Sequence, residues 1–242
     1  MAADTILTII RDFAPRVGVG KPTTATGSTD VQVQQMVALA NEEGQELAAR
    51  FDWQQLILEA TWTSVATEDQ GALSGTIVSA ALGFNHILND TIWNRTTKVG
   101  PGGPLSPVAW QANKATSYTG PYSQYRIRGG HLLLLPAPAA GETLAFEYVS
   151  ENWVSNTTGD ATSNAFVSDD DYPLLDSRLI KLGLIWRWKA AKGLDYSQEF
   201  QNYELAVADA KTRNIPRTKV SMNGPCDDFQ PFIQVARGNW MQ

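Results

Sequence analysis

The chain contains few of the residues on which most site chemistry depends. Among its 242 residues it has one cysteine, Cys226, and two histidines, His86 and His131. A lone cysteine excludes an intramolecular disulfide framework and is typical of a reducing compartment, and Cys226 has no histidine near it in sequence to make it a nucleophile. The histidines lie far apart, without the paired spacing of a zinc site. We expect His131, which follows Gly129-Gly130, to begin a strand.

Long apolar runs and an excess of positive charge are also missing. No run approaches the ~20 apolar residues needed to span a bilayer. The N-terminus lacks the basic region and apolar block of a secretory signal. The net charge of −6 disfavours a surface that grips nucleic acid through its phosphates. We therefore expect a protein made in a cytoplasm, with no membrane partner, past which DNA could travel without specific binding.

Motifs for catalysis and for cofactor binding are weak. Asp169-Asp170-Asp171 lacks the glycine-containing loop of a calcium site and is expected to favour the start of a helix whose first residue is Pro173. Gly18-Val-Gly20-Lys21 is followed by proline where a phosphate loop needs Ser or Thr. GALSG, residues 71–75, has its serine misplaced for a nucleophile elbow. We predict no catalytic residue, no metal and no cofactor, and hence a protein that is not an enzyme.

Helical spacing of apolar residues occurs near the N-terminus. It predicts a short helix over Asp4–Phe13, capped by Asp4 and followed by Pro15. A longer helix is predicted from Thr29 or Asp30 to about Phe51. Its predicted buried stripe is Val33, Met36, Val37, Ala40, Gly44 and Leu47. Its predicted water-facing residues are Gln32, Glu43 and Glu46.

Helical spacing returns after the three aspartates. A helix is predicted from Pro173 to Gly193, and another from a Ser197 cap to Pro216. The buried face of the first is expected to be Leu175, Leu179, Leu182, Ile185 and Trp186. Its basic residues are Arg178, Lys181, Arg187, Lys189 and Lys192. Two interpretations stay open for them: a solvated face that suits the helix dipole, which is the more economical, or an interface with acidic neighbours.

Between these helices the apolar period changes to two, which is typical of strands. Residues 55–64 alternate, and a second alternation at Tyr125–Arg128 is followed by Gly129-Gly130, a tight hairpin turn. The apolar strand Leu132–Leu135 stops at Pro136, and Leu144, Phe146 and Tyr148 share one face of the next strand. Arg126 and Arg128 share a strand face that is either solvated or directed at phosphate or carboxylate. Ser106-Pro107 is expected to start one helical turn that carries Trp110.

The segment after Pro216 has no sustained periodicity but is rich in apolar residues. A solvated tail normally lacks them, so another surface is expected to bury them, either a neighbouring chain or the body of the same chain. The predicted subunit or portal interface residues are Phe229, Phe232, Ile233, Val235 and Trp240.

Together these patterns predict an α+β fold. Helices from both ends of the chain are expected to form one helical bundle, with an inserted antiparallel β domain and an extended C-terminal tail. The predicted ranges are 1–52 for the N-terminal helices, 53–168 for the β-rich insertion, 169–215 for the C-terminal helix pair and 216–242 for the tail.

The order of these pieces carries a resemblance. FNHILNDTIWNRTT, GPLSPVAWQ, YRIRGGHLLLLPAPAAGETLAFEYVSENWV and LLDSRLIKLGLIWRWKAAKGLDYSQEFQNYE follow one another within residues 1–215. Together they resemble the head-to-tail adaptor proteins of short-tailed bacteriophages, the tail tubular protein A or gatekeeper family.

That resemblance implies a structural virion protein of the phage neck. The adaptor is expected to form a closed ring of about twelve copies between the portal protein and the tail nozzle protein, around the channel for DNA ejection. Its C-terminal segment would contact the portal or an adjacent subunit. In isolation the chain could be monomeric and assemble only on the portal.

Two other functions stay open. A glycan-binding β module would stack sugars on Trp93, Trp110 and Trp153, which must then be exposed on one face. A tail-associated cell-wall hydrolase would need two carboxyl groups across a cleft, and no such pair stands out in the sequence.

Overall fold

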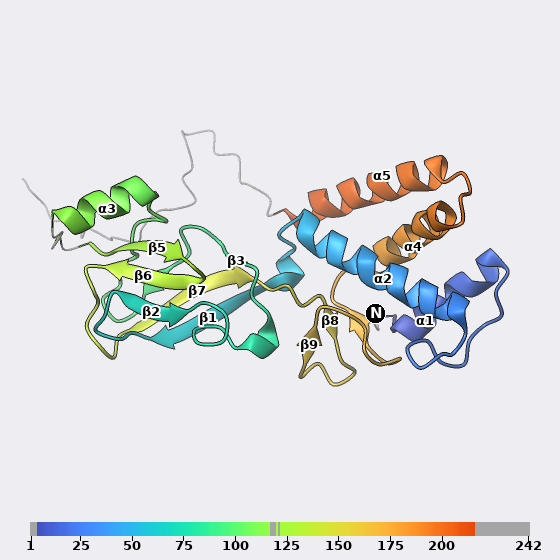
Figure 1. The fold of residues 1–242 in the computed structure, drawn as a ribbon, viewed down its shortest axis with the longest axis horizontal. Coiled ribbons are helices and arrows are strands. Elements are labelled where there is room, and N and C mark those ends of the chain that lie inside the picture. Colours follow the sequence, from blue (N-terminus) through green and yellow to red (C-terminus); the bar gives the residue numbers. More distant parts are fainter. Residues whose placement is uncertain (1–3, 117–119, 121, 216–242) are drawn as a thin grey trace, which may run out of the picture.

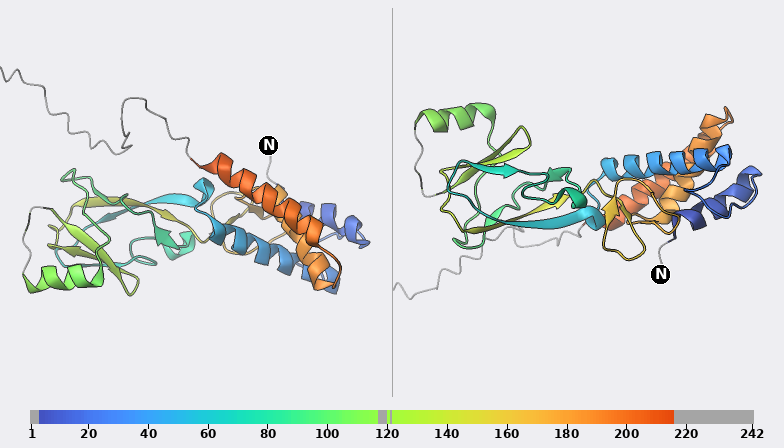
Figure 2. Two further views of the ribbon diagram at one scale, coloured as in Figure 1. Left: turned by 90° about the horizontal axis from the view of Figure 1, so that it is seen from above. Right: turned by 60° about the horizontal axis from the view of Figure 1, so that its bottom comes forward.

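The computed structural model describes residues 4–116, 120 and 122–215. Within this range the chain is α+β, with five α-helices and antiparallel sheets, as the sequence predicts. The molecule is elongated: four of the helices gather at one end and most strands at the other (Figures 1 and 2). The five predicted interface residues, Phe229, Phe232, Ile233, Val235 and Trp240, lie outside the described residues.

Four helices, drawn from both ends of the chain, form what we call the helical body. They are α1 (Ile6–Phe13), α2 (Val31–Arg50), α4 (Ser177–Ala191) and α5 (Ser197–Asn214). Helix α4 packs against α1, α2 and α5, so it is covered on several sides. The predicted buried face is therefore only partly right: Leu175 and Leu179 are buried, but Leu182, Ile185 and Trp186 are half-buried. The buried residues of α4 are Leu179, Ile180, Gly183, Leu184, Arg187 and Trp188.

Three predicted helix starts were wrong. Thr5, not Asp4, caps α1 by accepting a hydrogen bond from Thr8 N. Helix α4 begins at Ser177 with Asp176 as its cap, so it starts after Pro173. Ser197 is the first residue of α5 and not its cap; the residue before it, Tyr196, makes no side-chain capping hydrogen bond. Each error is a shift of one to four residues, because several polar residues near a helix start are chemically able to cap it.

The three consecutive aspartates do not cap α4. The backbone carbonyls of Asp171 and Asp169 instead accept hydrogen bonds from the first two amides of α1, at 2.8 and 3.3 Å. The Asp169 carboxylate accepts from the backbone N of Ala25 and of Thr26, at 2.9 and 2.7 Å. The segment thus satisfies the start of a helix, but one more than 150 positions away in the chain.

A β domain with its own apolar core lies at the other end of the molecule. One sheet has β7 (Thr143–Val149) at its centre, between β1 (Ile57–Thr63) on one side and β3 (His86–Ile87) and β4 (Trp93–Asn94) on the other. The second sheet has the order β2 (Asp69–Ala72), β6 (His131–Leu135), β5 (Gln124–Arg128). Helix α3 (Pro107–Ala115) lies beside this sheet (Figure 1), and it is longer than the predicted single turn.

The predicted hairpin is confirmed. Arg128 of β5 pairs with His131 of β6, so Gly129 and Gly130 alone form the turn. Their φ angles are +61° and +77°, the left-handed conformation that glycine adopts without steric cost. His131 begins β6, as predicted.

A third, small sheet connects the two ends of the molecule. It has the order β10 (Tyr172–Pro173), β8 (Val154–Ser155), β9 (Thr162–Ser163). Next to it, Trp153 is fully buried in the core of the helical body. A Cβ at Gly44 of α2 would overlap the Trp153 ring, so glycine is needed there. Short 3₁₀ turns occur at Ala14–Val17, Gln54–Leu56 and Ala80–Leu82.

Candidate functional site

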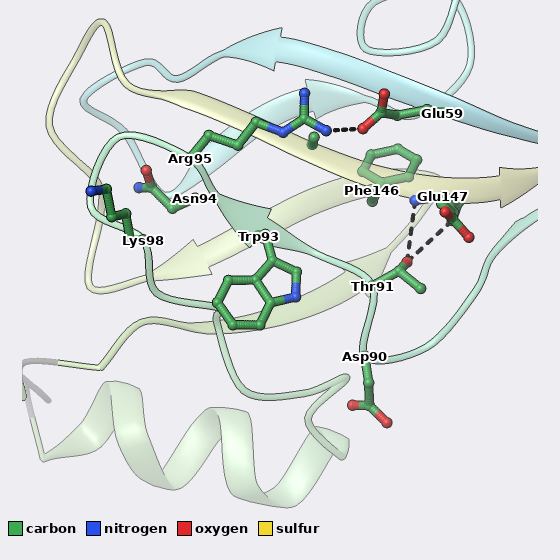
Figure 3. Close-up of a pocket in the computed structure, with 10 residues that line it drawn as sticks. Glu59, Asp90, Thr91, Trp93, Asn94, Arg95, Lys98, Phe146 and Glu147 are labelled. Atoms are coloured by element: carbon green, nitrogen blue, oxygen red, sulfur yellow. Dashed lines mark hydrogen bonds and ion pairs between the residues drawn. The ribbon is translucent and has the colours of Figure 1, made fainter. Parts of the chain in front are cut away.

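A groove on the outer face of the sheet that contains β1, β4 and β7 is a candidate site. Its volume is about 640 Å³ (Figure 3). The strand register brings its residues together: Glu59 of β1 lies opposite Glu147 of β7, and Trp93 of β4 lies opposite Ala145. The lining residues are Glu59, Asp90, Thr91, Trp93, Asn94, Arg95, Lys98, Ala145, Phe146 and Glu147.

Charges in the groove are partly satisfied within the chain. Arg95 forms an ion pair with Glu59, and both side chains are about half exposed. Thr91 Oγ1 accepts a hydrogen bond from the Glu147 backbone N at 3.2 Å. Glu59 and Glu147 lie opposite each other on neighbouring strands of one sheet face. They do not flank a cleft from two sides, the arrangement that a glycosidase needs. The groove could hold a small polar ligand, but its geometry indicates no particular reaction.

The three tryptophans of the glycan hypothesis do not share a face. Trp110 and Trp153 are fully buried in the protein. Trp153 donates its indole N–H to the Asn164 carbonyl at 2.9 Å. Only Trp93 lies at a groove, so the three side chains do not form the exposed stacking surface that this hypothesis requires.

The two histidines lie apart, each beside one aspartate. His86 Nε2 is 3.2 Å from Asp52, and His131 Nδ1 is 2.9 Å from Asp69. Hydrogen bonds from the backbone N of Gly71 and from His131 hold the pKa of Asp69 below its ordinary value. Within the described residues, no cluster of three His, Cys, Asp or Glu side chains could hold a metal ion.

Arg126 and Arg128 lie on β5, where they pair with Leu133 and His131 of β6. Arg128 is exposed, and its charge contributes to lowering the pKa of Asp69. This position of Arg126 and Arg128 is compatible with both open interpretations, a solvated face and an anion site.

A buried ion network joins α2 to α4 in the helical body, and it corrects two predictions. Glu43, expected to face water, is 0% exposed, and Arg187, expected on a solvated basic face, is 7% exposed. Arg187 Nε donates to Glu43 Oε2 at 2.6 Å. Arg187 also forms ion pairs with Glu42 and Glu46.

Other basic residues of α4 also meet acidic partners. Lys181 pairs with Asp4 and Asp12 near α1, at 2.8 and 2.7 Å, and Lys189 pairs with Glu199 of α5. The interpretation of the α4 basic residues as an interface with acidic neighbours is therefore correct for Lys181, Arg187 and Lys189, and the neighbours belong to the same chain.

Burial and charge act in opposite directions on this network. Burial raises the pKa of Glu43, and the attraction of Arg187 only partly offsets this. Burial alone would lower the pKa of Arg187, but its hydrogen bond to Glu43 and the surrounding carboxylates raise it overall. Burial, together with the adjacent Glu43, raises the pKa of Tyr203. The network is therefore a device that fixes α2 against α4, since each charge depends on the other.

One sequence signal could have located this network. Gly183 lies four residues before Arg187, and a Cβ there would overlap the Glu43 carboxyl group. Glycine in a helix interior is unfavourable unless a neighbour needs the space, so it marks a close helix crossing. Such a crossing can bury a charged residue if its partner lies on the facing helix.

Two comparisons with known proteins give no relative. No protein-family model matches this sequence, and no curated protein matches it. In the described part of the chain, no helix has both the length and the apolar character needed to cross a membrane.

Proposed function

We propose that this chain is a structural connector, the head-to-tail adaptor of a short-tailed bacteriophage. About twelve copies would form a closed ring in the virion neck, with the portal protein on one side and the tail nozzle protein on the other. The four helices of the helical body would act as a bundle in the ring wall, and the β domain would project from it. Residues 216–242 would contact the portal or an adjacent copy.

The single observation that carries this proposal is the arrangement of two cores in one elongated molecule. Helices from both chain ends pack around α4, while the β domain has a separate core and lies to one side (Figure 1). An elongated subunit with a helical end and a β end can contact two different partners along one axis. This arrangement supports an adaptor that contacts a portal with one end and a nozzle with the other.

The charge properties support the same proposal. A connector must keep its shape while it transmits contacts, and the buried pair of Arg187 and Glu43 fixes two wall helices together. The net charge of −6 suits a wall that DNA passes without being held, since DNA affinity depends mainly on Lys and Arg at phosphates.

The proposal can be tested by assembly on a portal ring. The purified full-length chain is mixed with portal rings from short-tailed phages, and binding is measured by analytical ultracentrifugation. We expect a discrete complex with many copies per portal ring. The matched control is a chain that ends at Ile215; it should keep its circular dichroism spectrum but bind weakly. If the full-length chain sits on no portal, the proposal is wrong.

A further inference from the structure

The indole ring of Trp93 is supported on one face and lines the groove of the β domain with the other. A Cβ at Gly100 would lie 3.6 and 3.7 Å from the ring carbons Cε2 and Cδ2, which form the bond shared by the two rings. A neighbour at the edge of the ring would meet its outer atoms first, so the chain at Gly100 lies over a ring face. The opposite face is left for the groove, in which the ring is half-buried (Figure 3).

The charges around this ring differ in sign from one end of the groove to the other. Lys98 lies on one side of the ring, and Asp90 and Glu147 lie toward the other (Figure 3). All three side chains are exposed, and in the described part of the chain none of them forms an ion pair. Arg95 and Glu59 neutralise each other at a third border of the groove.

The backbone holds two of these charged residues in an unusual conformation. Asp90 and Lys98 have φ angles of +65° and +60°, and they are the two non-glycine residues with positive φ in the described ranges. Such positions are uncommon and are concentrated at functional sites. The turn before Lys98 is fixed by Asn94, whose Oδ1 accepts hydrogen bonds from Thr96 N and Thr97 N, both at 3.0 Å. A group that is already held in place loses little freedom when it binds a ligand.

These features favour one chemical class of ligand. A simple anion would be repelled by Asp90 and Glu147, and a simple cation would be repelled by Lys98. A sugar ring suits both ends of the groove, because each hydroxyl group both donates and accepts hydrogen bonds. Carboxylates accept from such hydroxyls, and an ammonium group donates to them. The apolar C–H face of the same sugar ring matches the face of an indole.

We propose that this groove binds one pyranose ring of a carbohydrate. The sugar ring lies on Trp93, donates hydroxyl hydrogen bonds to Glu147 and Asp90, and accepts one from Lys98. The groove volume of about 640 Å³ lies within the roughly 300–1,000 Å³ of small-ligand sites. This site needs a single tryptophan, so it differs from the surface of three tryptophans that the structure rules out. It does not depend on the proposed ring and adds a sugar-binding activity to the β domain.

The test follows the indole N–H signal of Trp93 in ¹H–¹⁵N NMR spectra of the full-length chain. The Trp93→Phe variant lacks this signal and therefore identifies it. Methyl pyranosides of glucose, galactose, mannose and N-acetylglucosamine are added separately at millimolar concentrations. We expect at least one of them to shift the Trp93 signal saturably, while the other indole signals stay in place.

Two variants test the recognition chemistry with the same pyranoside. Trp93→Ala removes the stacking surface, and Glu147→Gln removes a carboxylate but keeps the size of the side chain. Each should weaken binding roughly tenfold, measured by isothermal titration calorimetry. The matched control is Glu151→Gln, an exposed glutamate outside the groove, which should leave the affinity unchanged. If circular dichroism shows that Trp93→Ala does not fold, Glu147→Gln still decides the question.

The remaining outcomes overturn the inference. If glycine or a short peptide shifts the Trp93 signal and none of the pyranosides does, the groove recognises a zwitterion and not a sugar. A Trp93 signal that responds to none of these probes, or an unchanged affinity of Glu147→Gln, also contradicts the sugar site. None of these measurements involves a portal ring, so the proposed adaptor function stands or falls separately.

Discussion

The helical body and the β domain are stabilised by different kinds of interaction. The helical body joins segments more than 100 positions apart in the chain, and it includes buried charges that must find each other, Glu43 and Arg187. The β domain is made from one continuous stretch, and its buried polar residues, such as Gln70 and Asn94, are uncharged. Its charges lie outside, in the groove around Arg95. The comparison indicates a stiff helical part and a β part with surfaces available for contacts.

The largest loss of stability is expected for Arg187→Met in the helical body. This substitution leaves Glu43 buried without its counter-charge, and breaking a buried pair from one side costs about 3–5 kcal/mol. We expect the free energy of unfolding, measured in urea by tryptophan fluorescence, to fall by that amount. The double variant Arg187→Met with Glu43→Gln should recover part of the loss.

Arg213→Met is the matched control for Arg187→Met. Arg213 pairs with Asp209 on the surface of α5, and its side chain is 72% exposed. It should change the free energy of unfolding by less than about 0.5 kcal/mol. Equal losses for the two variants would contradict the role of the buried network.

Substitution of one glycine in each part of the molecule should cause smaller losses of stability. Gly183→Ala places a Cβ against the Glu43 carboxyl group in a closed helix crossing, so it should destabilise the chain by about 1–3 kcal/mol through overpacking. Gly130→Ala meets open space but has a φ of +77°, so it should cost about 1 kcal/mol from backbone strain. Thermal unfolding by calorimetry measures both. A larger loss for Gly130→Ala would reverse our interpretation.

Asp169→Asn tests the junction between α1 and the loop before α2. Burial acts to raise the pKa of Asp169, but hydrogen bonds from Thr26 and Ala25 outweigh it and hold the pKa below the ordinary 3.8. A lowered pKa in the folded state means stability that is present above pH 3.8 and is lost as pH falls through the folded-state pKa. We expect a loss of about 1 kcal/mol at pH 7 that shrinks at acid pH. A pH-independent difference, in urea titrations from pH 7 to pH 3, would contradict this.

The smallest effect is expected in the groove of the β domain. Arg95→Gln breaks the ion pair with Glu59, whose side chains are both about half exposed. An exposed pair contributes about 0.2–1 kcal/mol, so this loss should be well below that of Arg187→Met in the same urea assay. If the two losses match, burial does not distinguish the two arginine sites.

The β domain was more predictable from the sequence than the helical body. Alternation and the Gly129-Gly130 turn are local signals, and they located β1, β5, β6, β7 and the hairpin. They missed β2, and residues 55 and 56 belong to a 3₁₀ turn before β1. Helical periodicity located the helices, but it treats a charged residue as exposed. It therefore could not predict that Glu43 and Arg187 are buried together, because each depends on a partner 144 positions away.

The prediction that the three aspartates favour the start of α4 was wrong for a related reason. The sequence suggested the next helix as their partner, but Asp169 and Asp171 meet α1 and the loop at Ala25 and Thr26. A local pattern indicates that a carboxylate or carbonyl can accept helix amides, but not which helix supplies them. Trp93 was named only as one of three sugar-stacking candidates. The groove itself was not predicted, since it arises only when β1, β4 and β7 pair.

The central claim is that sister copies join into a conduit through the C-terminal segment. Cryo-electron microscopy of the full-length chain assembled on a portal ring tests it most directly. We predict a closed ring around an open lumen, with helical bodies in its wall and residues 216–242 of each copy lying on the next copy or on the portal. A map in which each segment folds back onto its own copy, with no symmetric contacts between copies, would contradict the account.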